Sequence, residues 1–585
     1  MRLRGRRAYP ANVSDLRVLM GVGLLALGAV GYPTAADAAI ASFASAAHDL
    51  PKDLSSSERE FYDAVVGDQP DWMPDGQIFT DSGFRAADDA FGFMNYGDSL
   101  LLNQKFFGQP RPFTTPRETP QRSRLVPRDL RILFGDDVCI DGTASSPSSN
   151  CTLTESGEQV RRDAYSWAKA GHCFGFANVS AGAFSGYIDS AAFGVARPTI
   201  DTPLDRKVQR AFGRQVVVAH FGVSTIPVAS ALDVVAKLSA MLAIGELPVV
   251  LILSGPPGGH AVVPYALYEG EGGKIDIGVY DPNFPGKDRA VKVDSRTGQW
   301  RYQGSPIPAQ VPMLWDSQEP SGSTRMFLSP IEGNFAVQPC PFCQEVEDRT
   351  VVAFSPVRRE NVKVFESIRL LDVDGRELDP SLVEVVPPVQ SSYEWVSGPT
   401  LKVAVGVDFT VALSGAGVTT PEEFSISAYR PSDVKSIRIR DLRKTVSGII
   451  EIGAKTPRVR VRLSAPQRVR VRQTVEEPDA SFRFTAARVE RENGPEIELE
   501  VNRGLKEVIL ETGSFANSTV RLNLRSSSSQ GQATYQVSDV SVPAGARILV
   551  RYSGWRGDSG RPRVWIDLGS DGSVDERVPI RKVGQ

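Results

Sequence analysis

The pattern of hydrophobic and polar residues divides the chain into a helical part, a strand-containing part and a long series of short strands. In the first part, apolar residues recur at the spacing of one helix face. The predicted helices cover residues 157–170, 173–188 and 232–244. Three later runs, 247–253, 260–267 and 274–280, have strand length, and a glycine-rich turn separates the last two. This order predicts an α+β domain, which we place at residues 126–345.

From residue 346 onward the pattern is typical of all-β proteins. Short β-branched runs alternate with Gly, Pro, Ser and Asp as far as the C-terminus. Such a series predicts β-sandwich modules of the immunoglobulin-like kind. We place one at residues 346–476 and a second at residues 477–585.

Two segments of the β-rich part, 458–462 and 468–472, alternate strictly between arginine and valine. Successive side chains of a strand point to opposite faces, so the arginines of each segment share one face. Such a face is either solvated opposite a valine-lined core or a contact for an anionic polymer, for example at a cell surface.

The N-terminus has the features of a secretory signal. Arginines precede an apolar run from Val18 to Val30, and residues 36–38 have the small side chains of a cleavage site. The apolar run is too short to span a bilayer, and no later run reaches the roughly 18–20 residues of a membrane helix. We therefore expect a signal peptide at 1–38, an N-terminal extension at 39–125, and a secreted or cell-surface protein without a transmembrane segment.

The overall composition narrows the class of protein. A chain of 585 residues with 41% hydrophobic and 23% charged residues is ordinary globular material and is long enough for about two to four domains. Its net charge of −3 creates no broad field that would attract nucleic acid. Partners must therefore be recognised by local sites.

The chain has five cysteines, an odd number. Cys139 and Cys151 flank a short polar stretch and are expected to close a surface loop as a disulfide. Cys340 and Cys343 could form a small disulfide ring, bind a metal or carry redox chemistry. A zinc site needs about four ligands, and the neighbouring prolines disfavour the helix of a redox motif, so we expect a structural disulfide, with no metal and no cofactor. Cys173 is then left as a free thiol.

Cys173 stands at the start of a predicted helix, His260 follows two glycines at the start of a strand, and Asp281 follows the end of the next strand. A helix N-terminus and a nearby imidazole both stabilise a thiolate, and a third polar group can orient the imidazole. We predict that these residues are nucleophile, base and orienter. Each residue also has a purely structural interpretation: Cys173 as a buried apolar residue, His260 as a strand residue with backbone partners, and Asp281 as a turn residue. Asn283 is an alternative orienter.

The order of these residues resembles that of the papain-like cysteine peptidases, and within them the C39-type, bacteriocin-processing branch. The likeness covers about residues 157–295. It consists of a cysteine that opens a helix, a helix and an apolar strand, a histidine that opens the next strand, and a hairpin that ends at Asp281. The resemblance implies a papain-like fold with a Cys-His-Asp site that acts through a thioester acyl-enzyme.

The chain departs from this family at the oxyanion donor. Papain-like peptidases usually have a glutamine about six residues before the nucleophile, and Trp167 stands at that position here. Loss of such a donor costs on the order of 100-fold in rate. The residues that could replace it are Asn95, Gln159 and His172.

These observations lead to two hypotheses. The first is a secreted cysteine hydrolase, a peptidase or amidase, whose β modules serve attachment or substrate presentation; transfer of the acyl group to an amine is a variant of the same chemistry. The second is an extracellular binding or adhesive protein that keeps the papain-like scaffold without turnover. The fold alone does not separate them, because function depends on the site.

Overall fold

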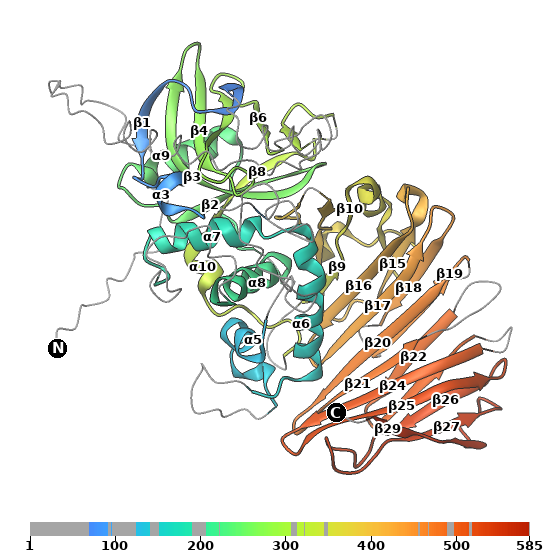
Figure 1. Ribbon diagram of the computed structural model, residues 1–585. Helices are drawn as coiled ribbons and strands as arrows, with labels where there is room; N and C mark the ends of the chain where they lie inside the picture. The colour runs from blue at the N-terminus through green and yellow to red at the C-terminus, as the bar shows by residue number, and fades with distance from the viewer. Residues whose placement is uncertain are drawn as a thin grey trace, which may run out of the picture. The chain divides into compact units, whose positions relative to one another are not determined.

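The structure is a computed structural model (Figure 1). It describes residues 70–91, 95, 125–140, 151–189, 206–221, 223–305, 313–320, 322–343, 349–392, 394–453, 457–465, 467–487, 496–513 and 518–583. The expected signal peptide at 1–38 and most of the expected extension at 39–125 lie outside these residues. The chain separates into two compact units, Met1–Lys52 and Asp53–Gln585, and everything described below belongs to the second.

The α-helices of the described residues lie before Ala336. They are α3 (Ala86–Asp89), α5 (Pro127–Phe134), α6 (Glu155–Trp167), α7 (Cys173–Phe184), α8 (Arg206–Phe221), α9 (Ala231–Leu242) and α10 (Ile331–Phe335). Three of them, α6, α7 and α9, correspond to the helices that the periodicity predicts. Thr154 caps α6 by accepting a hydrogen bond from the Gly157 amide at 3.0 Å. Between α6 and α7, Gly171 has a φ of +93°, which lets the chain reverse before Cys173.

Most strands of the first sheet come after α9 in the chain. Its strands are β1 (Gln77–Asp81), which precedes α3, then β2 (Val249–Gly255), β3 (Gly258–Gly270), β4 (Lys274–Tyr280), β5 (Asp288–Asp294), β6 (Trp300–Gln303), β7 (Leu314–Asp316) and β8 (Arg325–Pro330), which leads into α10. The order is β7-β6-β5-β4-β3-β2-β8, with β1 on β3, and all pairs are antiparallel. Helix α7 packs on β2 and β3, and α9 packs on β3. The predicted α+β arrangement is thus confirmed.

The second half of the chain forms two large antiparallel sheets. One has the order β11-β15-β18-β19-β22-β23-β26-β27-β28 and the other β12-β14-β9-β16-β17-β20-β21-β24-β25-β29, while β10 pairs with β13. The strands of the first are β11 (Arg369–Leu371), β15 (Phe409–Ser414), β18 (Ser447–Ile452), β19 (Arg458–Leu463), β22 (Glu496–Asn502), β23 (Glu507–Glu511), β26 (Arg547–Arg551), β27 (Arg563–Asp567) and β28 (Glu576–Val578). Those of the second are β9 (Arg349–Phe354), β12 (Val383–Val386), β14 (Thr400–Ala404), β16 (Glu422–Arg430), β17 (Asp433–Leu442), β20 (Arg468–Glu477), β21 (Ala480–Ala487), β24 (Ser518–Ser528), β25 (Gly531–Val542) and β29 (Arg581–Val583). The short pair is β10 (Val357–Arg358) and β13 (Trp395–Val396).

Both large sheets contribute to one hydrophobic core. This core extends from Val352 to Val578, and a β-rich, sandwich-like region is therefore confirmed. The division predicted at residue 476 falls inside β20, which pairs with β17 on one side and β21 on the other. Because strands from both sides of that position join the same two sheets, the region is continuous there.

The arginine rows on β19 and β20 have different surroundings. On β19, Arg460 and Arg462 pair with Glu498 and Glu496 of β22, which lies beside them. These ion pairs balance the charges of the two arginines within the sheet. On β20, Arg472 instead donates a hydrogen bond of 2.5 Å to a glutamine of α6.

The cysteines pair as predicted. Cys139 is bonded to Cys151 and Cys340 to Cys343, which leaves the buried Cys173 as a free thiol. Within the described ranges, no group of three or more His, Cys, Asp and Glu side chains could hold a metal ion. The described part of the chain also has no helix that is long and apolar enough to cross a membrane.

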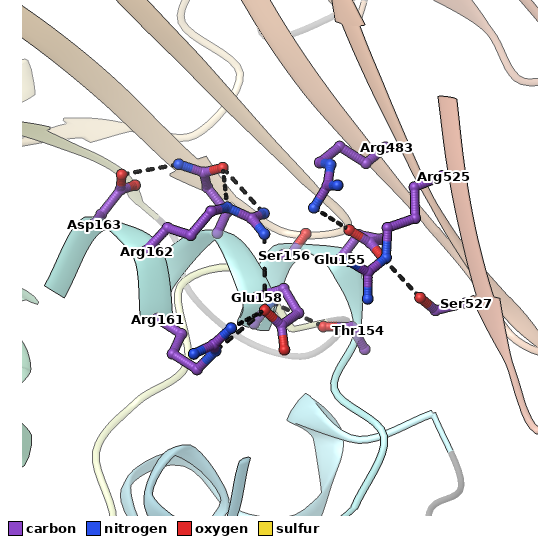
Figure 2. Close-up of polar contacts among 12 residues, drawn as sticks. Thr154, Glu155, Ser156, Glu158, Arg161, Arg162, Asp163, Arg483, Arg525 and Ser527 are labelled. Carbon is purple, nitrogen blue, oxygen red and sulfur yellow. Dashed lines mark hydrogen bonds and ion pairs between the residues drawn. The ribbon is translucent and has the colours of Figure 1, made fainter. Parts of the chain in front are cut away.

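A buried polar junction joins α6 to the ten-stranded sheet. Figure 2 shows Glu155, at the start of α6, between Arg483 of β21 and Arg525 of β24. Each arginine lies 2.8 Å from the Glu155 carboxylate, and the Ser527 hydroxyl donates a third contact of 2.7 Å. Glu155 is fully buried, so these contacts replace the water that its charge has lost.

Replacing Glu155 by Ala should strongly destabilise the fold, because it leaves two largely buried guanidinium groups without their carboxylate. The expected loss in the free energy of unfolding is about 3–5 kcal/mol, measured by urea denaturation. The matched change is Arg161→Ala on the same helix, which removes a partly exposed pair with Glu158 and should cost less than about 1 kcal/mol. Equal losses in the two variants would contradict this account of the junction.

The same junction contains a carboxyl group with an unusual titration. Glu476 of β20 accepts a hydrogen bond of 2.9 Å from the Ser156 amide, and burial raises its pKa from 4.5 to about 7. Because the folded state favours the protonated form, its stabilising effect is present below pH 4.5 and is lost as the pH rises through about 7. A glutamine at this position would stay neutral at every pH, so the free energy of unfolding of Glu476→Gln, measured by urea denaturation, should rise relative to that of the wild type by about 1–3 kcal/mol between pH 5 and pH 8. A difference between the two proteins that does not change with pH would exclude this titration.

Candidate active site

Cys173 is the first residue of α7 and lies in the core of the α+β part. Its side chain is fully buried, and its thiol donates a hydrogen bond to the Val389 carbonyl at 3.9 Å. The preceding Gly171, in its left-handed conformation, directs the chain so that the cysteine begins the helix. The first N–H groups of a helix have no acceptor within the helix, so Cys173 stands where backbone donors gather.

His260 and Asp281 meet because two hairpins are joined in series. His260 lies on β3 opposite Leu253 of β2, and β3 continues through a tight turn into β4. Asp281 follows the last residue of β4. The His260 Nε2 atom is 2.8 Å from the Asp281 Oδ1 atom, and both side chains are fully buried. The structure thus brings the predicted base and orienter into direct contact.

Asp281 is held by two further donors. The Tyr302 hydroxyl donates to its Oδ2 atom at 2.5 Å, and the Asn283 amide donates to its Oδ1 atom at 2.7 Å. These bonds satisfy both carboxylate oxygens and fix the direction in which Asp281 faces His260. A buried carboxylate needs such partners, because it has no water to solvate it.

Trp315 of β7 covers the histidine ring. The two rings are nearly parallel, at an angle of 14° and a centroid distance of 5.6 Å. The Trp315 indole also donates a hydrogen bond of 3.0 Å to the Gly258 carbonyl, which ties it to the start of β3. This packing limits rotation of the His260 ring and keeps water away from its contact with Asp281.

The protonation of His260 follows from these neighbours. Burial lowers the pKa of His260, but its electrostatic and hydrogen-bond interactions with Asp281 and Cys173 outweigh this effect and raise the pKa to about 10. The other ring nitrogen, Nδ1, is also buried, and Cys173 is the residue besides Asp281 whose interaction with the ring raises this pKa. An imidazolium held in this way is the group that stabilises a neighbouring thiolate.

Asn283 and Asn95 form hydrogen bonds that hold the residues around Asp281 and the start of α7 together. The Asn283 side chain donates to the Gly304 carbonyl at 2.9 Å and accepts from Asn95 at 3.2 Å, so Asp281, and not Asn283, contacts the histidine. The Asn95 oxygen accepts a hydrogen bond of 2.8 Å from the His172 amide. Asn95 therefore links the start of α7 to the turn that carries Asp281.

The other two candidate oxyanion donors have different surroundings. The His172 ring lies beside Phe212, with a centroid distance of 6.3 Å. Gln159 belongs to the junction between α6 and the ten-stranded sheet, where its amide donates to Asp163 at 2.8 Å and accepts from Arg472. The structure does not bring Gln159 to the cysteine.

Trp167, at the position where a glutamine is usual in the family that the sequence resembles, is a core residue. Its indole stacks on the His220 ring at 4.4 Å and at an angle of 6°, and its edge packs against Phe221. Burial lowers the pKa of His220 to about 4, so this ring is a neutral partner in the stack. The side chain at position 167 thus supports the nucleophile helix and offers no donor to the thiol.

Tyr302 and Trp315 were not among the residues that the sequence indicates. They come from β6 and β7, and only the antiparallel order of the sheet brings them to Asp281 and His260. An aromatic residue on a short strand is ordinary core material, so its spacing carries no signal of a site.

Comparison of the chain with models of protein families, with curated proteins and with solved structures finds no match. What the site can do must therefore be argued from its own geometry. It contains a free thiol at a helix N-terminus and a histidine whose ring is oriented by a carboxylate, and all three side chains are fully buried. Groups of this kind carry out nucleophilic acyl chemistry.

Asp281→Ala should lower the pKa of His260 well below 10, because burial then acts without the opposing carboxylate. The measurement is a pH titration of the His260 ring by NMR. The matched variant Asn283→Ala keeps the carboxylate and should retain a raised pKa. An unchanged titration in Asp281→Ala would show that the contact with Asp281 does not control the protonation of the ring.

Proposed function

We propose that this protein is a cysteine hydrolase that cleaves a peptide or amide bond through a thioester, on a papain-like domain of the C39 kind. The observation that carries the proposal is the His260–Asp281 contact, buried in the same core as the free thiol of Cys173. The sequence resemblance supports the same arrangement, and the order of helices and antiparallel strands agrees with it. Asn283, the alternative orienter, takes the role of a brace in this proposal.

In this mechanism the Cys173 thiolate attacks the carbonyl carbon of the substrate. His260 carries the proton and transfers it to the departing amine, which leaves a thioester on Cys173. Water then attacks the thioester while His260 accepts a proton, and the acid product and free thiol are released. Asp281 stays ionised and keeps the ring oriented through both steps.

The developing oxyanion would be stabilised by backbone donors at the start of α7. Amide groups of a helix N-terminus point along the axis and favour negative charge. Asn95 lies close to this point through its contact with the His172 amide and is the side chain that could assist. Trp167 cannot, because it belongs to the aromatic stack.

The protein is proposed to act outside the cell. Two disulfides among four of the five cysteines are compatible with an oxidising compartment. The N-terminal sequence supports export. The large β-rich region could attach the enzyme to a surface polymer, but the pairing of the first arginine row with glutamates leaves that row without free charge.

A second candidate function is a binding protein without turnover. The observations that favour it are the full burial of Cys173 and the aromatic stack around Trp167. In that case the cysteine would be a core residue and His260 would not affect its reactivity.

The two functions differ in the reactivity of Cys173 towards iodoacetamide at neutral pH. For a hydrolase, His260→Ala should slow the alkylation of Cys173 by at least about tenfold, because the thiolate loses its partner charge. The rate is followed by intact mass, and Cys173→Ser identifies the labelled position. A rate that does not depend on His260 would favour the binding protein.

A further inference from the structure

A short segment from the β-rich half lies over Cys173. It consists of residues 387–392, the first part of the connection between β12 and β13, and we call it the covering segment. Its residues Val389, Gln390 and Ser391 are buried. The Val389 carbonyl oxygen is the group that faces the thiol, at 3.9 Å. The nucleophile is thus closed off by a piece of main chain and not only by side chains.

The covering segment is bonded to the nucleophile side of the site. The Gln390 amide donates to the Trp167 carbonyl at 3.5 Å, and the Ser392 hydroxyl donates to the Lys169 carbonyl at 3.2 Å. Trp167 is the last residue of α6, and Lys169 lies in the short 3-10 helix Ala168–Ala170 that leads towards Cys173.

The covering segment is also bonded to the histidine side. The Ser391 hydroxyl donates a hydrogen bond of 2.7 Å to the Gly259 carbonyl, next to His260. Arg359 adds a second link between the covering segment and the histidine side. Its guanidinium donates to the Ser392 carbonyl at 2.6 Å and to the Pro257 carbonyl, just before β3, at 2.7 Å. The segment therefore bridges the two sides that carry the nucleophile and the base.

Glycines on both sides leave room for this main chain. A Cβ atom at Gly259 would lie 2.1 Å from the Pro388 carbonyl oxygen, and one at Gly258 would lie 3.1 Å from the Ser391 Cβ atom. On the nucleophile side, a Cβ atom at Gly171 would lie 3.1 Å from the Ser391 carbonyl oxygen. The glycine pair before His260 is thus explained by the close approach of another segment of the same chain.

We propose that the space between Gly171 and Gly258-Gly259 is the substrate-binding cleft, that its substrate is a polypeptide, and that the covering segment occupies it in place of the substrate. This inference rests on the proposed hydrolase function. Backbone carbonyls and glycines line both sides, and such surfaces recognise a peptide main chain. Val389 marks the position beside the thiol, which would take a small aliphatic residue.

The covering segment is placed to block the cleft and not to be cleaved. The thiol contacts the oxygen of the Val389 carbonyl, whereas attack requires the carbonyl carbon at about 3–3.5 Å. Pro387 and Pro388 fix the backbone φ angles at the start of the segment, and Pro388 restricts Pro387 to extended backbone. Access of a substrate to Cys173 then requires the segment to leave.

The test compares two rates in the full-length protein. One is the alkylation of Cys173 by iodoacetamide, and the other is hydrogen exchange of the amides at 389–392. Arg359→Ala removes two anchoring bonds and should raise both rates by about tenfold. Arg376→Ala is the matched control, because its partners are Asp372 and Asp374, and it should change neither rate.

A free peptide with the sequence of residues 387–392 provides a second measurement. If the cleft binds a polypeptide, this peptide should slow the alkylation of Cys173 in Arg359→Ala by at least about twofold at saturating concentration. A peptide with the same composition in scrambled order should have no such effect. Absence of protection by the ordered peptide would overturn the assignment of the substrate class.

The outcomes separate this inference from the proposed function. Alkylation that keeps its wild-type rate in Arg359→Ala while exchange at 389–392 becomes faster would overturn the covering role and leave the hydrolase proposal standing. Alkylation that follows exchange but is unaffected by His260→Ala in the Arg359→Ala background would support the covering role and overturn the hydrolase. Alkylation that follows exchange and needs His260 supports both.

Discussion

The site depends on one buried contact, that between His260 and Asp281. A buried carboxyl group is stable only if its oxygens have hydrogen-bond partners, and the histidine, Tyr302 and the Asn283 amide provide them. The same carboxylate offsets the effect of burial on the ring, so His260 can remain charged beside Cys173. Without this contact, the thiol would lie in an apolar core beside a neutral ring.

The β-rich half has its own hydrophobic core and also contributes residues to the core of the α+β part. Glu155 at the start of α6 is neutralised by arginines of β21 and β24, so the helix that precedes the nucleophile is fixed to the large sheet. A loop of the same half supplies the covering segment over Cys173. The two halves are therefore linked at two places, by the ion pairs of Glu155 and by the covering segment at Cys173. The second link explains why the nucleophile is enclosed.

The sequence was sufficient to predict the helices and strands around the candidate residues and the order of these residues along the chain. Helical periodicity placed Cys173 at the start of a helix, and the short turn after β3 predicted that His260 and Asp281 share one end of a hairpin. It was not sufficient for contacts between distant parts of the chain. Tyr302 and Val389 reach the site through sheet order and through packing of the second half, and neither leaves a local pattern. For the same reason, the continuity of the sheets across residue 476 could not be predicted.

The central claim is that Cys173 is a nucleophile in a peptide-binding cleft that the covering segment occupies. A peptidyl acyloxymethyl ketone reacts with an activated cysteine and places a peptide in its cleft, so mass mapping of the adduct combined with hydrogen exchange tests both parts at once. The account predicts an adduct on Cys173 and faster exchange at residues 389–392 in the modified protein. An adduct that leaves the exchange of this segment unchanged, or the absence of any adduct on Cys173, would contradict it.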